Sequence, residues 1–185
     1  MEQTWRDWAR GHGIDADAIM AIAHGRQNEE IIRIVAPHLD LPEEYERMIR
    51  AEEECLGVVA VAGARELVDA LPADRWAVVT SAWRRLAEIR MGLAGLGLPP
   101  VVVTSDDITR SKPDPEGYLA AAARLGARPA DCIVIEDAPA GLEAGRRAGM
   151  RVIGVITNFS RERLDADWYV TDLRGIRPVS GDLLT

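Results

Sequence analysis

The chain has 185 residues, of which 48% are hydrophobic and 28% charged, and its formal net charge is −8. This balance is typical of a folded globular protein rather than of a disordered or membrane protein, and the length allows one core with a small flanking unit. Because basic residues are scattered among acidic ones, the longest apolar run (Cys55–Ala64) is short and the N-terminus lacks a signal-peptide pattern, we expect a cytoplasmic protein with no nucleic-acid and no membrane partner.

The first 57 residues have the pattern of helices and contain no candidate strand. Glycine and proline residues divide this stretch, and acidic or small polar residues stand where helices begin. We expect four helices, at Thr4–His12, Asp15–His24, Asn28–Ala36 and Pro42–Cys55. Residues 1–57 are therefore predicted to form a helical cap.

From residue 58 onward, short apolar runs rich in β-branched residues alternate with helical segments. The expected strands are Trp76–Thr80, Val101–Thr104, Cys132–Glu136, Val152–Ile156 and Trp168–Val170. The expected helices are Ala64–Leu71, Arg84–Ala94, Glu116–Leu125 and Ala140–Ala148. This alternation predicts a Rossmann-like α/β core with a parallel sheet over residues 58–185. Ligands of such sheets bind at the carboxyl ends of the strands, so polar residues there are candidates for a site.

Two of these strand ends carry groups suited to an anion. Thr80 and Ser81 follow the first strand, where their hydroxyls and a helix N-terminus could bind phosphate; a simple helix cap is the alternative. Lys112 follows the second strand, within the stiff turn Ser111–Pro115 at the start of a helix. A lysine there opposes the helix dipole, which predicts that it meets an anionic ligand or a carboxylate. The alternative is a solvated loop lysine.

The third strand ends in two adjacent acids, Glu136 and Asp137. Two carboxylates at the tip of a buried strand repel each other and have raised pKa values unless a cation or a basic residue neutralises them. A divalent ion that prefers oxygen ligands, Mg²⁺ above all, fits this position. The alternative is a helix cap by Asp137 with Glu136 exposed. Gly141 and Gly145 in the next helix indicate close backbone packing beside this site.

The segments Val78–Ser81, Lys112–Pro115 and Ile133–Gly141 together resemble the second, third and fourth motifs of the haloacid dehalogenase-like hydrolases, in the branch with 2-deoxyglucose-6-phosphatase and glycerol phosphatase. The resemblance implies a magnesium-dependent phosphatase that hydrolyses a small phosphorylated metabolite, a sugar or polyol phosphate, through an aspartyl-phosphate intermediate. It also implies the site residues. Thr80 and Ser81 would bind the phosphoryl group, Lys112 would neutralise it, Glu136 and Asp137 would hold Mg²⁺, and Arg26 of the cap would meet the substrate.

Two points depart from the family pattern. The surroundings of Arg26 are less basic than expected, so a surface arginine at a helix end is the alternative. The first motif, Asp-x-Asp-Gly on a first central strand, is missing, and Asp7, Asp15 and Asp17 do not replace it. We therefore expect a chain that is poorly stable and inactive on its own. A phosphosugar mutase of the same fold and a non-catalytic relic that binds phosphorylated ligands or a partner protein are alternatives, and the sequence leaves the substrate and the oligomeric state open.

Overall fold

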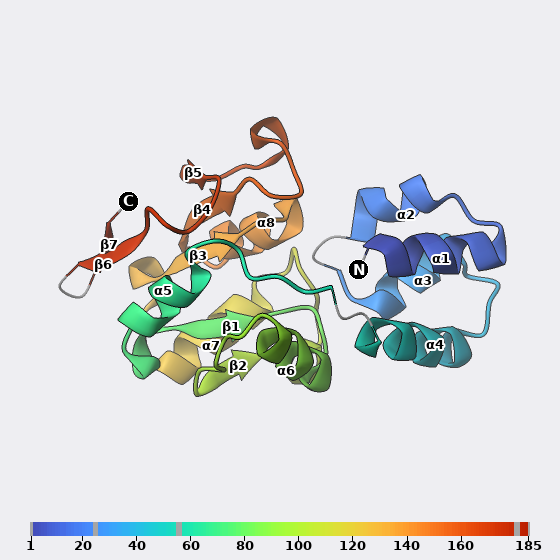
Figure 1. Cartoon of the computed structure of the whole chain (residues 1–185), viewed down its shortest axis with the longest axis horizontal. Coiled ribbons are helices and arrows are strands. Elements are labelled where there is room, and N and C mark those ends of the chain that lie inside the picture. The colour runs from blue at the N-terminus through green and yellow to red at the C-terminus, as the bar shows by residue number, and fades with distance from the viewer. Residues whose placement is uncertain (1, 24–25, 55–56, 180–181, 185) are drawn as a thin grey trace.

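The computed structural model describes residues 2–23, 26–54, 57–179 and 182–184. Two parts are visible, a helical part (residues 2–54) and an α/β part (residues 64–184), joined by the segment 57–63 (Figure 1). His24 and Cys55, which belong to predicted helices, lie outside the described residues. No helix in the described stretches is long and apolar enough to cross a membrane.

Four helices form the helical part and pack on one another. They are α1 (Glu2–His12), α2 (Ala16–Ala23), α3 (Asn28–Val35) and α4 (Leu41–Glu53). All four were predicted, and their inward faces bury a common core that includes Trp5, Ile19, Ile31, Ile32 and Met48. Glu44 of α4 lies in this core, where its carboxylate accepts a hydrogen bond from Trp8 Nε1 at 2.8 Å and lies 3.0 Å from His12 Nε2. These contacts give the helical part an interior of its own.

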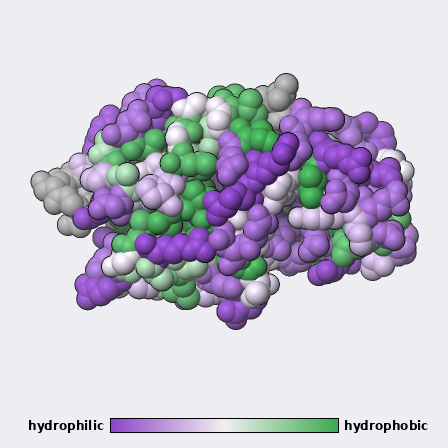
Figure 2. All heavy atoms as spheres, turned by 90° about the horizontal axis from the view of Figure 1, so that it is seen from below, coloured by the Kyte–Doolittle hydropathy of each residue, from purple (hydrophilic) through white to green (hydrophobic). Residues whose placement is uncertain are grey.

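The surface of the two parts differs in character. Figure 2 shows hydrophobic residues gathered over the α/β part on the face seen from below, whereas the helical part is mainly hydrophilic on that face. The difference fits a helical part whose apolar side chains face inward.

The α/β part contains every strand and helix that the sequence predicts for it. The strands are β1 (Ala77–Val79), β2 (Val101–Val103), β3 (Ile133–Glu136), β4 (Arg151–Val155) and β5 (Trp168–Val170). The helices are α5 (Ala64–Ala70), α6 (Arg84–Leu93), α7 (Glu116–Leu125) and α8 (Pro139–Arg147). Short 3₁₀ turns at Ala73–Arg75, Ser105–Asp107, Pro129–Asp131 and Arg161–Arg163 and the antiparallel strands β6 (Arg177–Val179) and β7 (Asp182–Leu184) were not predicted. The expected parallel α/β core is confirmed.

The parallel strands are divided between two sheets. β1 pairs with β2, while β3, β4 and β5 form a second sheet in that order. Among the described residues, no backbone hydrogen bond joins β1 to β3. The apolar side chains of Val78 in β1 and Ile135 in β3 are only half-buried, although both strands lie within the core. The facing edges of β1 and β3 are therefore open within the described part of the chain.

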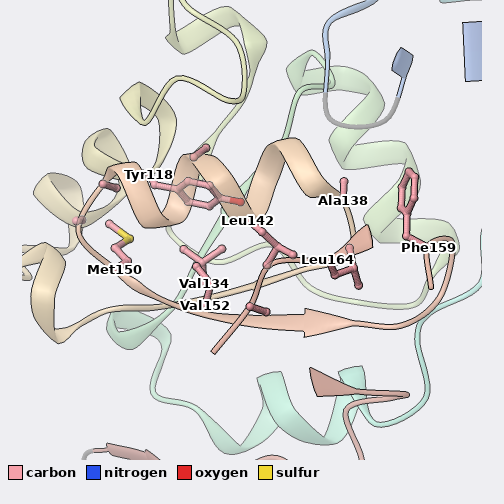
Figure 3. Close-up of a cluster of buried hydrophobic side chains, with 12 residues drawn as sticks. Tyr118, Val134, Ala138, Leu142, Met150, Val152, Phe159 and Leu164 are labelled. Carbon is pink, nitrogen blue, oxygen red and sulfur yellow. The ribbon is translucent and has the colours of Figure 1, made fainter. Parts of the chain in front are cut away.

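Helices cover both faces of the second sheet, and side chains along β3 alternate between these faces. Val134 packs under α8 with Leu142 and Val152, as Figure 3 shows, while Ile133 and Ile135 belong to a cluster with Leu67 of α5. By this alternation, the next residue, Glu136, points to the face covered by α7 and α8. Its contacts with those two helices define the site.

Asp107 organises the end of β2. Its carboxylate accepts hydrogen bonds at 2.9 Å from both the backbone N–H and the hydroxyl of the fully buried Thr104, and it pairs with the guanidinium groups of Arg84 and Arg124. Burial raises the pKa of Asp107, but the hydrogen bonds from Thr104 and Arg124 outweigh it, so the pKa lies well below its ordinary value. The turn after β2 is therefore held by a charged carboxylate.

We expect Asp107→Asn to lower the free energy of unfolding by about 1–3 kcal/mol at neutral pH, because an amide cannot accept all of these hydrogen bonds. Since the folded-state pKa is lowered, this contribution is full above the ordinary value of 3.8 and is lost as the pH falls through the folded pKa. Urea titrations at pH 7 and in acid should show the two proteins converging at low pH. Asp131→Asn, which removes an exposed pair with Arg128, is the control and should change little.

Candidate active site

The ends of β1 and β3 border a cavity of about 770 Å³ that reaches from the α/β part to the helical part. All six residues that the sequence predicts for the site line this cavity. They are Arg26, Thr80, Ser81, Lys112, Glu136 and Asp137. The fold thus brings together groups that come from four separate stretches of the chain.

A buried ion pair between Lys112 and Glu136 lies at the centre of the site. Lys112 Nζ is 2.5 Å from Glu136 Oε1 and donates a second, longer hydrogen bond to the backbone carbonyl of Val79 at 3.4 Å. Only 8% of Lys112 is exposed. Lys112 is therefore not a solvated loop residue. The carboxylate that it was predicted to meet is Glu136, and this lysine is the basic residue that the paired acids require.

The ion pair keeps both of its groups charged. Burial lowers the pKa of Lys112, but the Glu136 carboxylate and the hydroxyl of Tyr118 together raise it by more, so the net shift is upward. Burial raises the pKa of Glu136, whereas Lys112 and the backbone N–H groups of Ala138 and Asp137 lower it, and the net shift is downward. At neutral pH the site holds an ammonium and a carboxylate in direct contact.

Thr80 and Ser81 directly follow the carboxyl end of β1. The Thr80 hydroxyl oxygen accepts a hydrogen bond from the backbone N–H of Ala82 at 3.1 Å, which leaves its O–H as a possible donor. Helix α6 begins at Arg84, as the sequence predicts, and its first N–H donates to Asp106 at 3.0 Å. The Thr80 hydroxyl, rather than the first N–H of this helix, is therefore the group offered to an anion.

Asp137 is the more accessible of the two acids. Its Oδ2 accepts hydrogen bonds from Asn158 Nδ2 at 2.8 Å and Thr157 Oγ1 at 3.4 Å. Burial, followed by the charge of Glu136, raises the pKa of Asp137. Within the described ranges, no cluster of three or more Asp, Glu, His or Cys side chains is arranged to hold a metal ion.

Arg26 lines the cavity from the helical part, where its guanidinium group is paired with a carboxylate. Its Nη1 lies 2.5 Å from Glu30 Oε1 in α3, and Ser111 donates a hydrogen bond to the other oxygen of Glu30. The residue is half-buried rather than on the open surface. Glu30 thus neutralises Arg26 and ties the helical part to the turn that carries Lys112.

Comparison with known proteins gives the family. The profile of the haloacid dehalogenase-like hydrolases matches residues 14–155, which includes all three recognised motifs. The chain belongs to this family. Hexitol phosphatase A of Escherichia coli (strain K12) is 37% identical over 171 residues, covering 89% of this chain and 79% of the relative.

A second relative agrees with this assignment, and a solved structure shares the fold. Glycerol-1-phosphate phosphohydrolase 2 of Saccharomyces cerevisiae (strain ATCC 204508 / S288c) is 32% identical over 174 residues, covering 86% of this chain and 69% of the relative. The crystal structure of a hydrolase from Pseudomonas syringae shares the fold, with a TM-score of 0.79 at 23% identity over 94% of this chain and 86% of that one. The predicted resemblance to the sugar-phosphatase branch of the hydrolases is confirmed.

One contributor to the ion pair was not found from the sequence. The hydroxyl of Tyr118 in α7 donates to Glu136 Oε1 at 3.3 Å, and Lys112 Nζ lies 5.1 Å from the centre of its ring. In the sequence Tyr118 looks like an ordinary core aromatic, and it does join the apolar cluster of Figure 3. No spacing pattern marks it, because Lys112 lies in the turn before α7 and Tyr118 meets Glu136 only through the tertiary fold.

The predicted close packing at Gly141 and Gly145 is confirmed. A Cβ at Gly145 would lie 2.9 Å from Val152 Cγ1, and one at Gly141 would overlap the carboxylate and Cγ of Glu136. Glu136 cannot easily move aside, because Lys112 and two backbone N–H groups hold it. Gly141 is therefore needed for the ion pair to form.

We expect Gly141→Ala to lower the free energy of unfolding by about 1–3 kcal/mol through overpacking. Gly92→Ala is the matched control, since it also lies in a helix of the α/β part and its added Cβ meets no atom within 4 Å. The control should raise stability by about 0.5–1 kcal/mol. Thermal unfolding of both variants measures the difference, and a Gly141→Ala protein as stable as the control would contradict the assigned packing.

Proposed function

We propose that the chain forms the cap and most of the core of a magnesium-dependent phosphatase that hydrolyses a small sugar or polyol phosphate. The observation that carries this proposal is the buried Lys112–Glu136 pair at the edge of the cavity, with the Thr80 hydroxyl on the same cavity wall. A fixed ammonium beside a hydroxyl donor suits a phosphoryl group, whose charge grows on its outer oxygens as it is transferred. Its relatives hexitol phosphatase A and glycerol-1-phosphate phosphohydrolase 2 support a sugar or polyol phosphate.

In this proposal the residues of the site have different roles. Thr80 and Ser81 orient the phosphoryl group, and Lys112 neutralises its charge. Glu136 fixes the ammonium in place. The helical part acts as the cap, since Arg26 and residues of α3 and α4 complete the cavity.

The chemistry of the acids fits a magnesium ion at Asp137. Asp137 has no ion pair among the described residues, and burial and the charge of Glu136 raise its pKa, whereas Glu136 is already neutralised by Lys112. Mg²⁺ usually takes one or two protein carboxylates together with water and phosphate oxygens, so the ion needs no dense cluster of acids. We propose Asp137 as its main ligand, with Glu136 beside it. When bound, the ion would supply positive charge to the phosphoryl oxygens.

The proposed reaction also needs an aspartate nucleophile. Asp137 is the only aspartate among the predicted site residues, and Asp7, Asp15 and Asp17 lie in or beside helices of the helical part. We propose that the nucleophile is carried by a strand that pairs with the open edges of β1 and β3, in the Asp-x-Asp-Gly frame. Such a strand would give both edges their missing hydrogen bonds and bring a carboxylate close to Lys112.

This assignment predicts how activity depends on the added strand. The 185-residue chain alone should show no magnesium-dependent hydrolysis of sugar phosphates, and an N-terminal extension that supplies an apolar strand ending in Asp-x-Asp-Gly should restore it. The same extension with Asn in place of the first Asp is the control. Turnover by the unextended chain that Asp137→Asn abolishes would contradict the proposal.

The role of Thr80 can be tested by binding. We expect Thr80→Val to weaken the affinity for inorganic phosphate about 10-fold or more, because it removes a hydrogen bond to a charged group. Isothermal titration calorimetry measures this affinity. Thr109→Val serves as the control, since Thr109 bonds to Glu116 and does not line the cavity. Unchanged phosphate affinity in Thr80→Val would remove Thr80 from the site.

A further inference from the structure

The charges that line the cavity are unevenly balanced. Six acidic and three basic side chains line it. Each basic one is already paired with a carboxylate, in the pairs Lys112–Glu136, Arg26–Glu30 and Arg90–Glu52. Glu29 and Asp106, by contrast, line the cavity without a cationic partner among the described residues. The cavity therefore holds an excess of negative charge away from Lys112.

This negative charge gathers where the helical part meets the α/β part. Tyr45 of α4 lies at this junction, with its ring edge against Trp83 and 6.5 Å between ring centres. Burial raises the pKa of Tyr45, and the charges of Glu29, Asp106 and Glu52 raise it further. We call these four residues, Glu29, Tyr45, Glu52 and Asp106, the acidic end of the cavity. The phenol stays protonated there and can act as a donor.

Glu52 is the most buried member of the acidic end. The residue is 3% exposed, and its carboxylate accepts hydrogen bonds from Asn28 Nδ2 at 2.9 Å and from Arg90 Nη2 at 3.4 Å. A carboxylate has about four acceptor positions, so two donors, one of them long, leave capacity for a ligand. The side-chain oxygen of Asn28 adds a further acceptor. These groups suit ligands that donate hydrogen bonds.

We propose that the acidic end determines specificity by accepting hydrogen bonds from the uncharged, hydroxyl-bearing end of the substrate and by rejecting a second anionic group. The inference rests on the proposed function, which places the phosphate at Lys112. Hydroxyl groups there would donate to Glu52, Asn28 and Asp106. A carboxylate or second phosphate in the same place would face repulsion from unneutralised acids, and the lining arginines Arg26 and Arg90 are already paired with carboxylates.

A pair of six-carbon ligands tests this directly. Sorbitol 6-phosphate and 6-phosphogluconate share their chain and most hydroxyls, and they differ in that the second has a carboxylate at the far end. We expect the 185-residue chain to bind sorbitol 6-phosphate at least 10-fold more tightly, as measured by calorimetry. Equal affinities, or tighter binding of 6-phosphogluconate through release of Arg90 from Glu52, would overturn the inference.

Variants separate the acidic end from its surroundings. Glu52→Gln and Asp106→Asn should each reduce the preference for sorbitol 6-phosphate by 3-fold or more, and Asp106 is exposed, so its variant should keep the fold. Glu53→Gln is the matched control, because Glu53 pairs with Arg85 of α6 as Glu52 pairs with Arg90 but does not line the cavity. An unchanged preference in both test variants, or an equal loss in Glu53→Gln, would overturn the assignment.

Inorganic phosphate distinguishes this inference from the function on which it rests. Phosphate occupies the Lys112 end only, so the Glu52 and Asp106 variants should bind it as the parent chain does. If the chain binds phosphate but does not discriminate between the two ligands, the inference fails and the proposed function stands. If the chain binds neither phosphate nor either ligand, the proposed function fails and the inference falls with it.

Discussion

The buried ion pair between Lys112 and Glu136 is the contact on which the site depends. Lys112 follows β2 of the first sheet, and Glu136 ends β3 of the second, so the pair joins two sheets that no backbone hydrogen bond joins within the described residues. An ammonium and a carboxylate in a dry interior are stable only when paired. The pair therefore fixes the distance between the strand ends, and Tyr118 and Gly141 shape the space in which it forms.

The cavity gains its chemical character from how each charge is neutralised. Arg26 and Arg90 would be natural phosphate ligands in isolation, but both already donate hydrogen bonds to carboxylates, Arg26 to Glu30 and Arg90 to Glu52. Lys112 is paired as well, yet it lies beside the Thr80 hydroxyl at the strand ends, where a phosphoryl group can share its charge. One end of the cavity thus suits an anion and the other suits hydroxyl groups, and this asymmetry orients an elongated substrate.

The sequence predicts the elements well because their signals are local. Apolar β-branched runs mark β1 to β5, and glycine or proline marks the helix ends, so no knowledge of the tertiary structure is needed. The six site residues follow from strand ends and motifs. Their partners do not, because Glu30, Tyr118 and Glu52 reach the site through folding, from positions with the ordinary pattern of helical residues. The prediction for Arg26 shows this limit, since Glu30, which decides its charge, could not be recognised from spacing alone.

Two adjacent glutamates at the end of α4, Glu52 and Glu53, bind Arg90 and Arg85 of α6, and so the helical part is held to the α/β part largely by ion pairs. Arg85 is mostly exposed, which leaves its pair open to screening by dissolved ions, whereas the buried pair of Glu52 is shielded. Rising ionic strength therefore weakens the exposed Glu53–Arg85 pair before the buried Glu52–Arg90 pair. Under the proposed function, in which the helical part is a cap, dissolved salt should loosen its contact with the α/β part first at Arg85.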